Sequence, residues 1–233
     1  PVFPTEWKNP ETNEVSPGYR ESGYFADAFT NMLALLGWNP GTPQELFSMD
    51  ELIEAFSLDR VGKAGAKFDF DKTKWFNQQY LRAKTGEELS ELANSFAQGK
   101  EIDKTYLSAV CELMKERATF TKDLWEESQF FFSAPQSYDE KTVRKKWKDQ
   151  TPSILQELSS LLDGIEDFSA EKIEVSFKFF LAEKELSFGA VLPNFRVAVT
   201  GLGMGPSMFQ ISALLGKKEV LARIQTAIDK IQK

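Results

Sequence analysis

Histidine is absent from the 233 residues of this chain, and Cys111 is its only cysteine. Without histidine, the sequence lacks the commonest general base and the commonest zinc ligand of proteins. One cysteine cannot form a disulfide within one chain, which suits a reducing compartment. The sequence also lacks a signal peptide and any apolar run of the roughly 18 residues that indicate a membrane span. We therefore expect a cytoplasmic protein with no metal site and no membrane partner.

Basic residues are also fewer than acidic ones. The chain has 28 lysines and arginines and 35 aspartates and glutamates, which gives a net charge of −7. Nonspecific affinity for nucleic acids comes from basic surface, so this balance argues against a general nucleic-acid-binding protein and against a DNA partner. Local basic patches remain compatible with it. Because the first residue is Pro1 rather than methionine, we expect the chain to have been cut from a longer protein.

Helical periodicity dominates what the sequence does contain. Apolar residues recur at helical spacing from Gly23 onward, and residues 1–22 are expected to form an extended lead-in with turns. Residues 169–185 are ambiguous, because Ile173, Val175 and Phe177 alternate as in a strand. We interpret this segment as a helix, since no neighbouring stretch offers a strand partner. The sequence predicts an all-α, two-lobed helical bundle.

Local signals indicate where helices begin and end. Residues 48–51 and 85–88 each carry the Ser/Thr and Glu spacing of a capping box, so each is expected to open a helix. Asp69 or Asp71 is expected to cap a third helix. Gly37 follows an apolar stripe, and we expect it to end that helix in a left-handed conformation.

The helical stripes also predict which side chains are buried. Ile53 and Phe56 are expected to face inward, whereas Asn77 and Arg82 are expected to face solvent. Cys111 lies among apolar stripe residues, which favours a buried structural thiol over a nucleophile.

Two short motifs could bind phosphate when they are judged on their residues alone. The GLGMG stretch at 201–205 lacks the preceding strand of a dinucleotide-binding loop, so a tight turn between helices is the better interpretation. Residues 137–149 form a strongly basic helix, which is either a solvated face or a phosphate-binding surface. Paired acids elsewhere are explained by solvated helix faces, and no catalytic residue is predicted in this chain.

Longer motifs carry a family resemblance. GYFADAFTNMLALLGWNPG at 23–41 and the stretch LFSMDELIEAFSLDRVGKAGAKFDFDKTKWFNQQYLR at 46–82 resemble bacterial-type glutamyl-tRNA synthetase, a class I aminoacyl-tRNA synthetase. The resemblance continues through CELMKERATFTKDLW, FRVAVTG and GPSMF, and so covers essentially the whole chain. One departure is Thr73, where the family usually has leucine.

A larger departure is that both ATP-site signatures of the family are missing. The resemblance therefore implies the C-terminal tRNA-binding portion only, without the catalytic domain. The parent protein would be a glutamate–tRNA ligase that attaches glutamate to its tRNA with ATP and magnesium. The fragment itself is expected to be inactive, to hold no cofactor, to bind glutamate-specific tRNA and to be a monomer.

The resemblance also assigns regions and residues. It implies a stem-contact-like helical region at 1–84 and an anticodon-binding helical domain at 85–233, with subdomains at about 85–132 and 133–233. Arg117 of ELMKER matches the arginine that recognises the first anticodon base, and its guanidinium suits a splayed base edge. The matched residues of the anticodon pocket are Arg196, Gly205, Pro206 and Met208, and the candidate contacts to the tRNA backbone are Lys72, Lys74, Arg82, Arg144, Lys145 and Lys146.

Two other hypotheses remain open at this point. A helical scaffold that binds a protein partner without RNA would tolerate the acidic charge. A free-standing enzyme ranks last, because no nucleophile–base pair or metal group is visible in the sequence.

Overall fold

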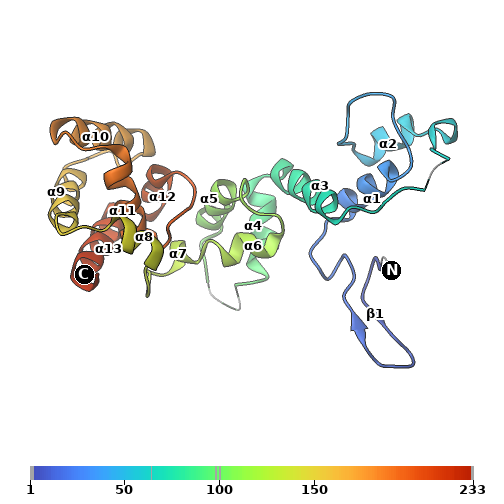
Figure 1. Ribbon diagram of the computed structural model, residues 1–233, viewed down its shortest axis with the longest axis horizontal. Helices are drawn as coiled ribbons and strands as arrows, with labels where there is room; N and C mark the ends of the chain where they lie inside the picture. The colour runs from blue at the N-terminus through green and yellow to red at the C-terminus, as the bar shows by residue number, and fades with distance from the viewer. Residues whose placement is uncertain (1–2, 64, 98, 100, 232–233) are drawn as a thin grey trace. The chain divides into compact units, whose positions relative to one another are not determined.

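The computed structural model describes residues 3–63, 65–97, 99 and 101–231, and most of these residues are helical (Figure 1). Within these ranges the sheet is confined to an antiparallel hairpin of β1 (Trp7–Lys8) and β2 (Val15–Ser16) near the N-terminus. The predicted all-α class is therefore confirmed, with short strands inside the expected extended lead-in.

The chain divides into two compact units, Pro1–Glu126 and Glu127–Lys233. The assignment of residues 1–84 and 85–233 to separate functional regions stays a prediction. The first unit contains α1 (Ala26–Leu35), α2 (Met49–Ala55), the 3-10 helix η1 (Leu58–Arg60), α3 (Phe70–Ala83), α4 (Gly86–Asn94), α5 (Lys104–Met114) and α6 (Thr121–Glu126). The second contains α7 (Gln129–Phe132), α8 (Glu140–Lys146), α9 (Thr151–Asp163), α10 (Ala170–Glu183), α11 (Phe188–Thr200), α12 (Met208–Leu215) and α13 (Lys217–Lys230).

The ambiguous segment forms helix α10, as predicted. Ile173 and Phe177 are fully buried, whereas Val175 and Phe179 are 59% and 64% exposed. Residues four apart share one face of a helix, so this burial pattern follows helical rather than strand periodicity. The apparent alternation arose because the exposed face of the helix also carries apolar side chains.

Helix starts agree with the sequence signals, but one helix end does not. Both capping boxes form, at Ser48 for α2 and at Thr85 for α4, and Asp69 caps α3. The prediction for Gly37 is wrong, because α1 ends at Leu35 and Gly37 is not among the described glycines with positive φ. The amide of Leu36 donates to the carbonyl of Leu33 instead, and this tighter turn ends the helix without a left-handed residue.

Helix α2 buries less of its apolar face than we predicted. Ile53 is 71% exposed, so its inward assignment is wrong. Phe56 is 45% exposed, but its ring centroid lies 5.5 Å from that of Trp38, so its inward assignment holds in part. Leu52 alone of this helix is buried, against a small cluster with Trp38 and Phe47. Ala55 is partly buried against the same cluster, so the cluster covers one side of α2 and leaves Ile53 in solvent.

Asn77 is the clearest error in the predicted faces. Its side chain is fully buried in α3 rather than exposed to solvent. The side-chain oxygen accepts a hydrogen bond from the amide of Phe25 at 2.8 Å, and the side-chain nitrogen donates to the carbonyl of Thr119 at 2.6 Å. A buried amide group is tolerated when both of its ends are paired, and here both are.

Candidate nucleic-acid interface

Arg117 lies on the turn that follows α5. Its amide donates to the carbonyl of Met114 at 3.0 Å, so its backbone is held in the turn. The side chain is exposed, and no salt bridge involves it in the part of the chain that the structure describes. An exposed guanidinium on a fixed backbone can donate two hydrogen bonds to one edge of a ligand.

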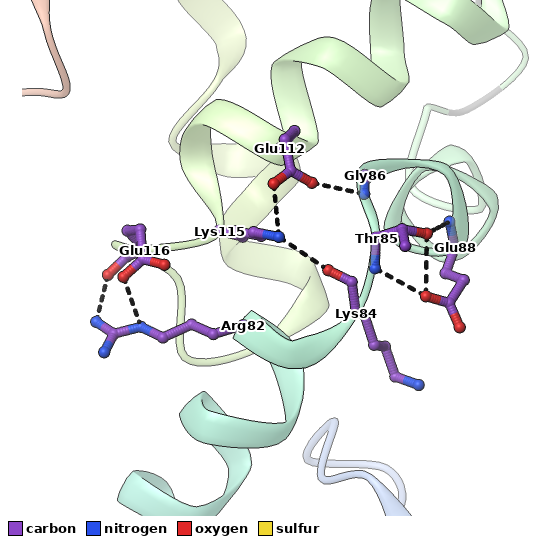
Figure 2. A network of polar contacts seen from close by, with 8 residues as sticks. All are labelled: Arg82, Lys84, Thr85, Gly86, Glu88, Glu112, Lys115 and Glu116. Carbon is purple, nitrogen blue, oxygen red and sulfur yellow. Dashed lines mark hydrogen bonds and ion pairs between the residues drawn. The ribbon is translucent and has the colours of Figure 1, made fainter.

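Arg82 lies at the end of α3, and its guanidinium is engaged within the first unit (Figure 2). Its Nη2 donates to the main-chain carbonyl of Glu116 at 2.5 Å, and its Nε lies 3.2 Å from a carboxylate oxygen of the same residue. The side chain of Arg82 is 31% exposed. The prediction that it faces solvent therefore holds only in part.

Two lysines of α3 were also predicted to contact the tRNA backbone. Lys72 pairs with Glu45 at 2.8 Å, with both side chains about half exposed, and Lys74 is exposed. A surface pair of this kind is weak, so Lys72 can exchange Glu45 for another anion at little cost. Thr73 between them is buried, and its hydroxyl donates to the carbonyl of Asp69 at 2.8 Å.

Three of the four predicted pocket residues meet in the second unit. Nη2 of Arg196, on α11, donates to the carbonyl of Pro206 at 2.7 Å. A Cβ atom added to Gly205 would lie 2.7 Å from Nη1 of Arg196, so a side chain at this position would displace the end of the Arg196 side chain.

The fourth pocket residue behaves differently. Met208 is the first residue of α12 and is only 1% exposed, so it packs inside the unit rather than forming surface. Met204, in the same loop, is 77% exposed and was not singled out from the sequence. The GLGMG pattern could have indicated it, because the residue between two loop glycines has few neighbours to cover it.

The glycine-rich loop is attached to the basic helix α8. The amide of Asp139, which caps α8, donates to the carbonyl of Gly201 at 2.8 Å. A Cβ atom on Gly203 would approach Oγ1 of Thr142 to 2.5 Å. Hydrogen bonds from the Thr142 side chain and amide hold the pKa of Asp139 below its usual range, which keeps the cap ionised. The loop at 201–205 therefore packs directly against the first turn of α8.

The basic side chains of α8 are exposed. Arg144, Lys145 and Lys146 all project from its last turn into solvent, and no salt bridge engages them within the described residues. Lys146 makes one weak hydrogen bond, from Nζ to the carbonyl of Gly189 at 3.3 Å. Trp147, next to them, is buried and anchors the end of the helix. This is a cationic surface on an otherwise acidic chain.

The described residues were compared with two kinds of reactive site, a nucleophilic thiol and a metal centre. The Cys111 thiol is buried, and burial raises its pKa from 9.0 to about 12, so it is a poor nucleophile at neutral pH. Across the described ranges, histidine, cysteine and acidic side chains form no cluster that could hold a metal ion. No helix there combines the length and the apolar character that crossing a membrane requires.

Comparison with known proteins places these features in one family. Residues 82–228 match the family described as "Anticodon binding domain". The chain belongs to this family. The matched anticodon-binding region includes Arg117, helix α8 and the loop that contacts Arg196.

The relatives named glutamate–tRNA ligase confirm the resemblance that the motifs indicated. The ligase of Phocaeicola vulgatus is 49% identical over 231 residues, which is 98% of this chain and 46% of that protein. That of Christiangramia forsetii is 45% identical over 234 residues, at 100% and 46% coverage. A crystal structure of a glutamate tRNA ligase from Elizabethkingia meningosepticum, in complex with its amino acid, aligns with a TM-score of 0.91 at 39% identity and covers 100% of this chain and 46% of that chain. The chain thus spans about half the length of these relatives.

Proposed function

We propose that this chain is the tRNA-binding part of a glutamate–tRNA ligase, which attaches glutamate to its tRNA using ATP. The observation that carries the proposal is the anticodon-binding family match over residues 82–228, which contains the exposed Arg117 and the exposed cations of α8. ATP and magnesium would be used by another part of the ligase. The role of this chain would be to hold the RNA in place.

Base recognition is assigned to Arg117 in the first unit and to the Arg196 loop in the second. An anticodon base is unstacked and exposes its hydrogen-bonding edge, which a planar guanidinium can contact with two donors. Around Arg196, the backbone of Gly205 and Pro206 is close to the guanidinium, so a base placed there would meet main-chain groups as well. Met208 supports this loop from inside, and the exposed Met204 can offer an apolar surface.

Phosphate contacts are assigned to Arg144, Lys145 and Lys146 on α8 and to Lys72 and Lys74 on α3. Each is exposed, and cations of this kind bind the backbone without regard to sequence. On a chain with a net charge of −7, these local patches would decide where the RNA binds.

The proposal is tested most directly at Arg117. We expect Arg117→Ala to cost about 1–3 kcal/mol in discrimination between a glutamate tRNA transcript and the same transcript with its first anticodon base changed. Filter binding with both transcripts at several salt concentrations would measure this. Lys122→Ala is the matched control, because it removes an exposed cation of the same unit that pairs with Glu126 at 3.1 Å.

Two outcomes would contradict the proposal in different ways. An equal loss of affinity for both transcripts in Arg117→Ala would make Arg117 a plain charge contact. If the unmodified chain did not bind tRNA but bound a protein with an affinity insensitive to salt, the protein-scaffold hypothesis would be favoured instead.

A further inference from the structure

Two side chains of α3 hold the turn that carries Arg117, one on each side of it. Nδ2 of Asn77 donates to the carbonyl of Thr119 at 2.6 Å, and Nη2 of Arg82 donates to the carbonyl of Glu116 at 2.5 Å. The backbone on both sides of Arg117 is therefore fixed by one helix that lies more than 30 residues earlier in the sequence.

A second set of contacts ties the same region to the start of α4. Nζ of Lys115 lies 2.6 Å from one carboxylate oxygen of Glu112 and 3.1 Å from the carbonyl of Lys84. The other carboxylate oxygen of Glu112 accepts from the amide of Gly86 at 2.8 Å. Figure 2 shows these contacts joining the 82–88 segment to the end of α5. The glycine is required, because a Cβ atom on Gly86 would lie 2.3 Å from the carbonyl oxygen of Ser108.

The bond from Arg82 to the main chain matters more than its ion pair. The Glu116 side chain is 66% exposed, and an ion pair in that setting contributes little. The carbonyl of Glu116 lies in the turn just beyond the end of α5, outside the helical hydrogen-bond pattern. A charged donor is among the stronger partners for such a group, and it fixes the direction of the peptide that leads into Arg117.

We propose that Arg82 is a positioning residue for Arg117: it sets the turn from which Arg117 recognises the first anticodon base, rather than contacting phosphate itself. This rests on the proposed function of Arg117. Asn77 holds the far end of the same turn at Thr119. The Glu112–Lys115 pair holds the segment between α3 and α4 through Lys84 and Gly86. In this arrangement α3, which precedes the predicted boundary at residue 84, determines how well Arg117, which follows that boundary, discriminates between bases.

The chemistry of Arg82 and Glu116 separates this proposal from a phosphate contact. Lysine keeps the charge of Arg82 but not the planar fork that contacts both the carbonyl and the carboxylate of Glu116. A phosphate contact would survive Arg82→Lys, whereas positioning would not. Glu116→Ala removes a negative charge beside Arg117, so electrostatics alone would tighten binding of every RNA. Because the carbonyl of Glu116 remains in this variant, positioning through the main chain predicts that discrimination between the two RNAs is kept.

The test is filter binding of the full chain to the glutamate tRNA transcript and its first-base variant across a salt series. We expect Arg82→Ala and Arg82→Lys to lower the ratio of the two affinities by about tenfold, with the salt slope unchanged. Glu116→Ala is expected to leave the ratio nearly unchanged, because it keeps the main-chain carbonyl that accepts from Arg82. Glu126→Ala is the matched control, because it removes an exposed carboxylate of the same unit that pairs with Lys122.

The outcomes separate this inference from the function on which it rests. An unmodified chain without any first-base preference would overturn the proposed function. If both Arg82 variants kept the first-base preference of the unmodified chain, only the positioning role would be overturned. The same holds if they lost affinity equally for both transcripts and the salt slope became smaller by about 1.

A measurement without RNA provides an independent check. Amide hydrogen exchange at residues 116–119 should speed up in Arg82→Ala while the cores of α9 and α13 keep their protection. Unchanged exchange at this turn would also overturn the positioning role.

Discussion

The amide group of Asn77 joins three segments that are distant in the sequence. From α3 it accepts the amide of Phe25, which precedes α1, and donates to the carbonyl of Thr119, which follows Arg117. Removing one partner of a fully buried polar group costs about 1–3 kcal/mol, because the other partner is left without water or a replacement. The position of the Arg117 turn therefore depends on a fully buried side chain that lies about 40 residues earlier in the sequence.

Cys111 gives a prediction about pH at the same scale. Burial raises the pKa of its thiol to about 12, above the 9.0 of an exposed thiol. Because the folded state keeps this proton while the unfolded state releases it, the stabilising effect is complete below pH 9.0 and is lost as the pH rises towards about 12. We expect the free energy of unfolding of the unmodified chain to fall relative to that of Cys111→Ala between these limits.

Urea unfolding of both proteins at pH 7.5, 9 and 10.5 would measure this difference. Substitution by alanine also leaves a cavity, but its cost does not depend on pH and appears as a constant offset. A difference between the two proteins that stays constant over the series would show that the thiol does not titrate in this way.

The error at Asn77 shows which part of the site could have been predicted from the sequence. Thr73, Asn77 and Leu81 are four residues apart and are all buried, so the helical period alone places Asn77 inside. Its polar side chain led to the opposite prediction. The partners of Asn77 could not have been predicted, because they depend on how three separate segments pack.

Among the elements, the glycine-rich loop determines how α8 is presented. Gly201 ends α11 with φ of 77°, and a Cβ atom there would lie 2.7 Å from the carbonyl oxygen of Ser137 and 2.8 Å from Cβ of Pro135. Both the left-handed backbone and the close contact require glycine. Because the carbonyl of Gly201 also accepts from the cap of α8, a change here would reach the basic helix.

We therefore expect Gly201→Ala to lower the free energy of unfolding by more than about 1 kcal/mol. Gly189→Ala provides a control of opposite sign. Gly189 is the second residue of α11, an added Cβ there meets no atom within 4 Å, and alanine is favoured over glycine in a helix by up to about 1 kcal/mol. Thermal unfolding of the two variants would measure both effects, and equal shifts would contradict the steric argument.

Helix beginnings were predictable from the sequence, whereas helix ends and faces were less so. A capping box is a local hydrogen-bond pattern within four residues, so Ser48 and Thr85 could be assigned without the fold. The end of α1 at Leu35 and the exposure of Ile53 depend on what packs against each helix. For the same reason, the burial of Met208 could not be predicted from its place in the GPSMF motif.

For the whole molecule, the central electrostatic question is how an acidic chain would bind RNA. The net charge of −7 repels a polyanion at long range, so binding has to come from local cations close to phosphates. Lys145 and Lys146 are exposed and lie in the last turn of α8, where no salt bridge in the described residues neutralises them. Each phosphate that a lysine neutralises would release counterions from the RNA, and this release makes binding sensitive to salt.

Reversing both charges should therefore change the salt dependence and not only the affinity. We expect Lys145→Glu combined with Lys146→Glu to weaken binding of the glutamate tRNA transcript. The slope of log affinity against log salt should fall by about 1.4–1.8, because each lost contact removes about 0.7–0.9. The matched control reverses Lys172 and Lys178, two exposed lysines on α10 in the same unit. Filter binding from low to moderate salt would give both slopes. If the two double variants changed the slope equally, only overall charge would matter; if neither changed it, α8 would not contact the RNA backbone.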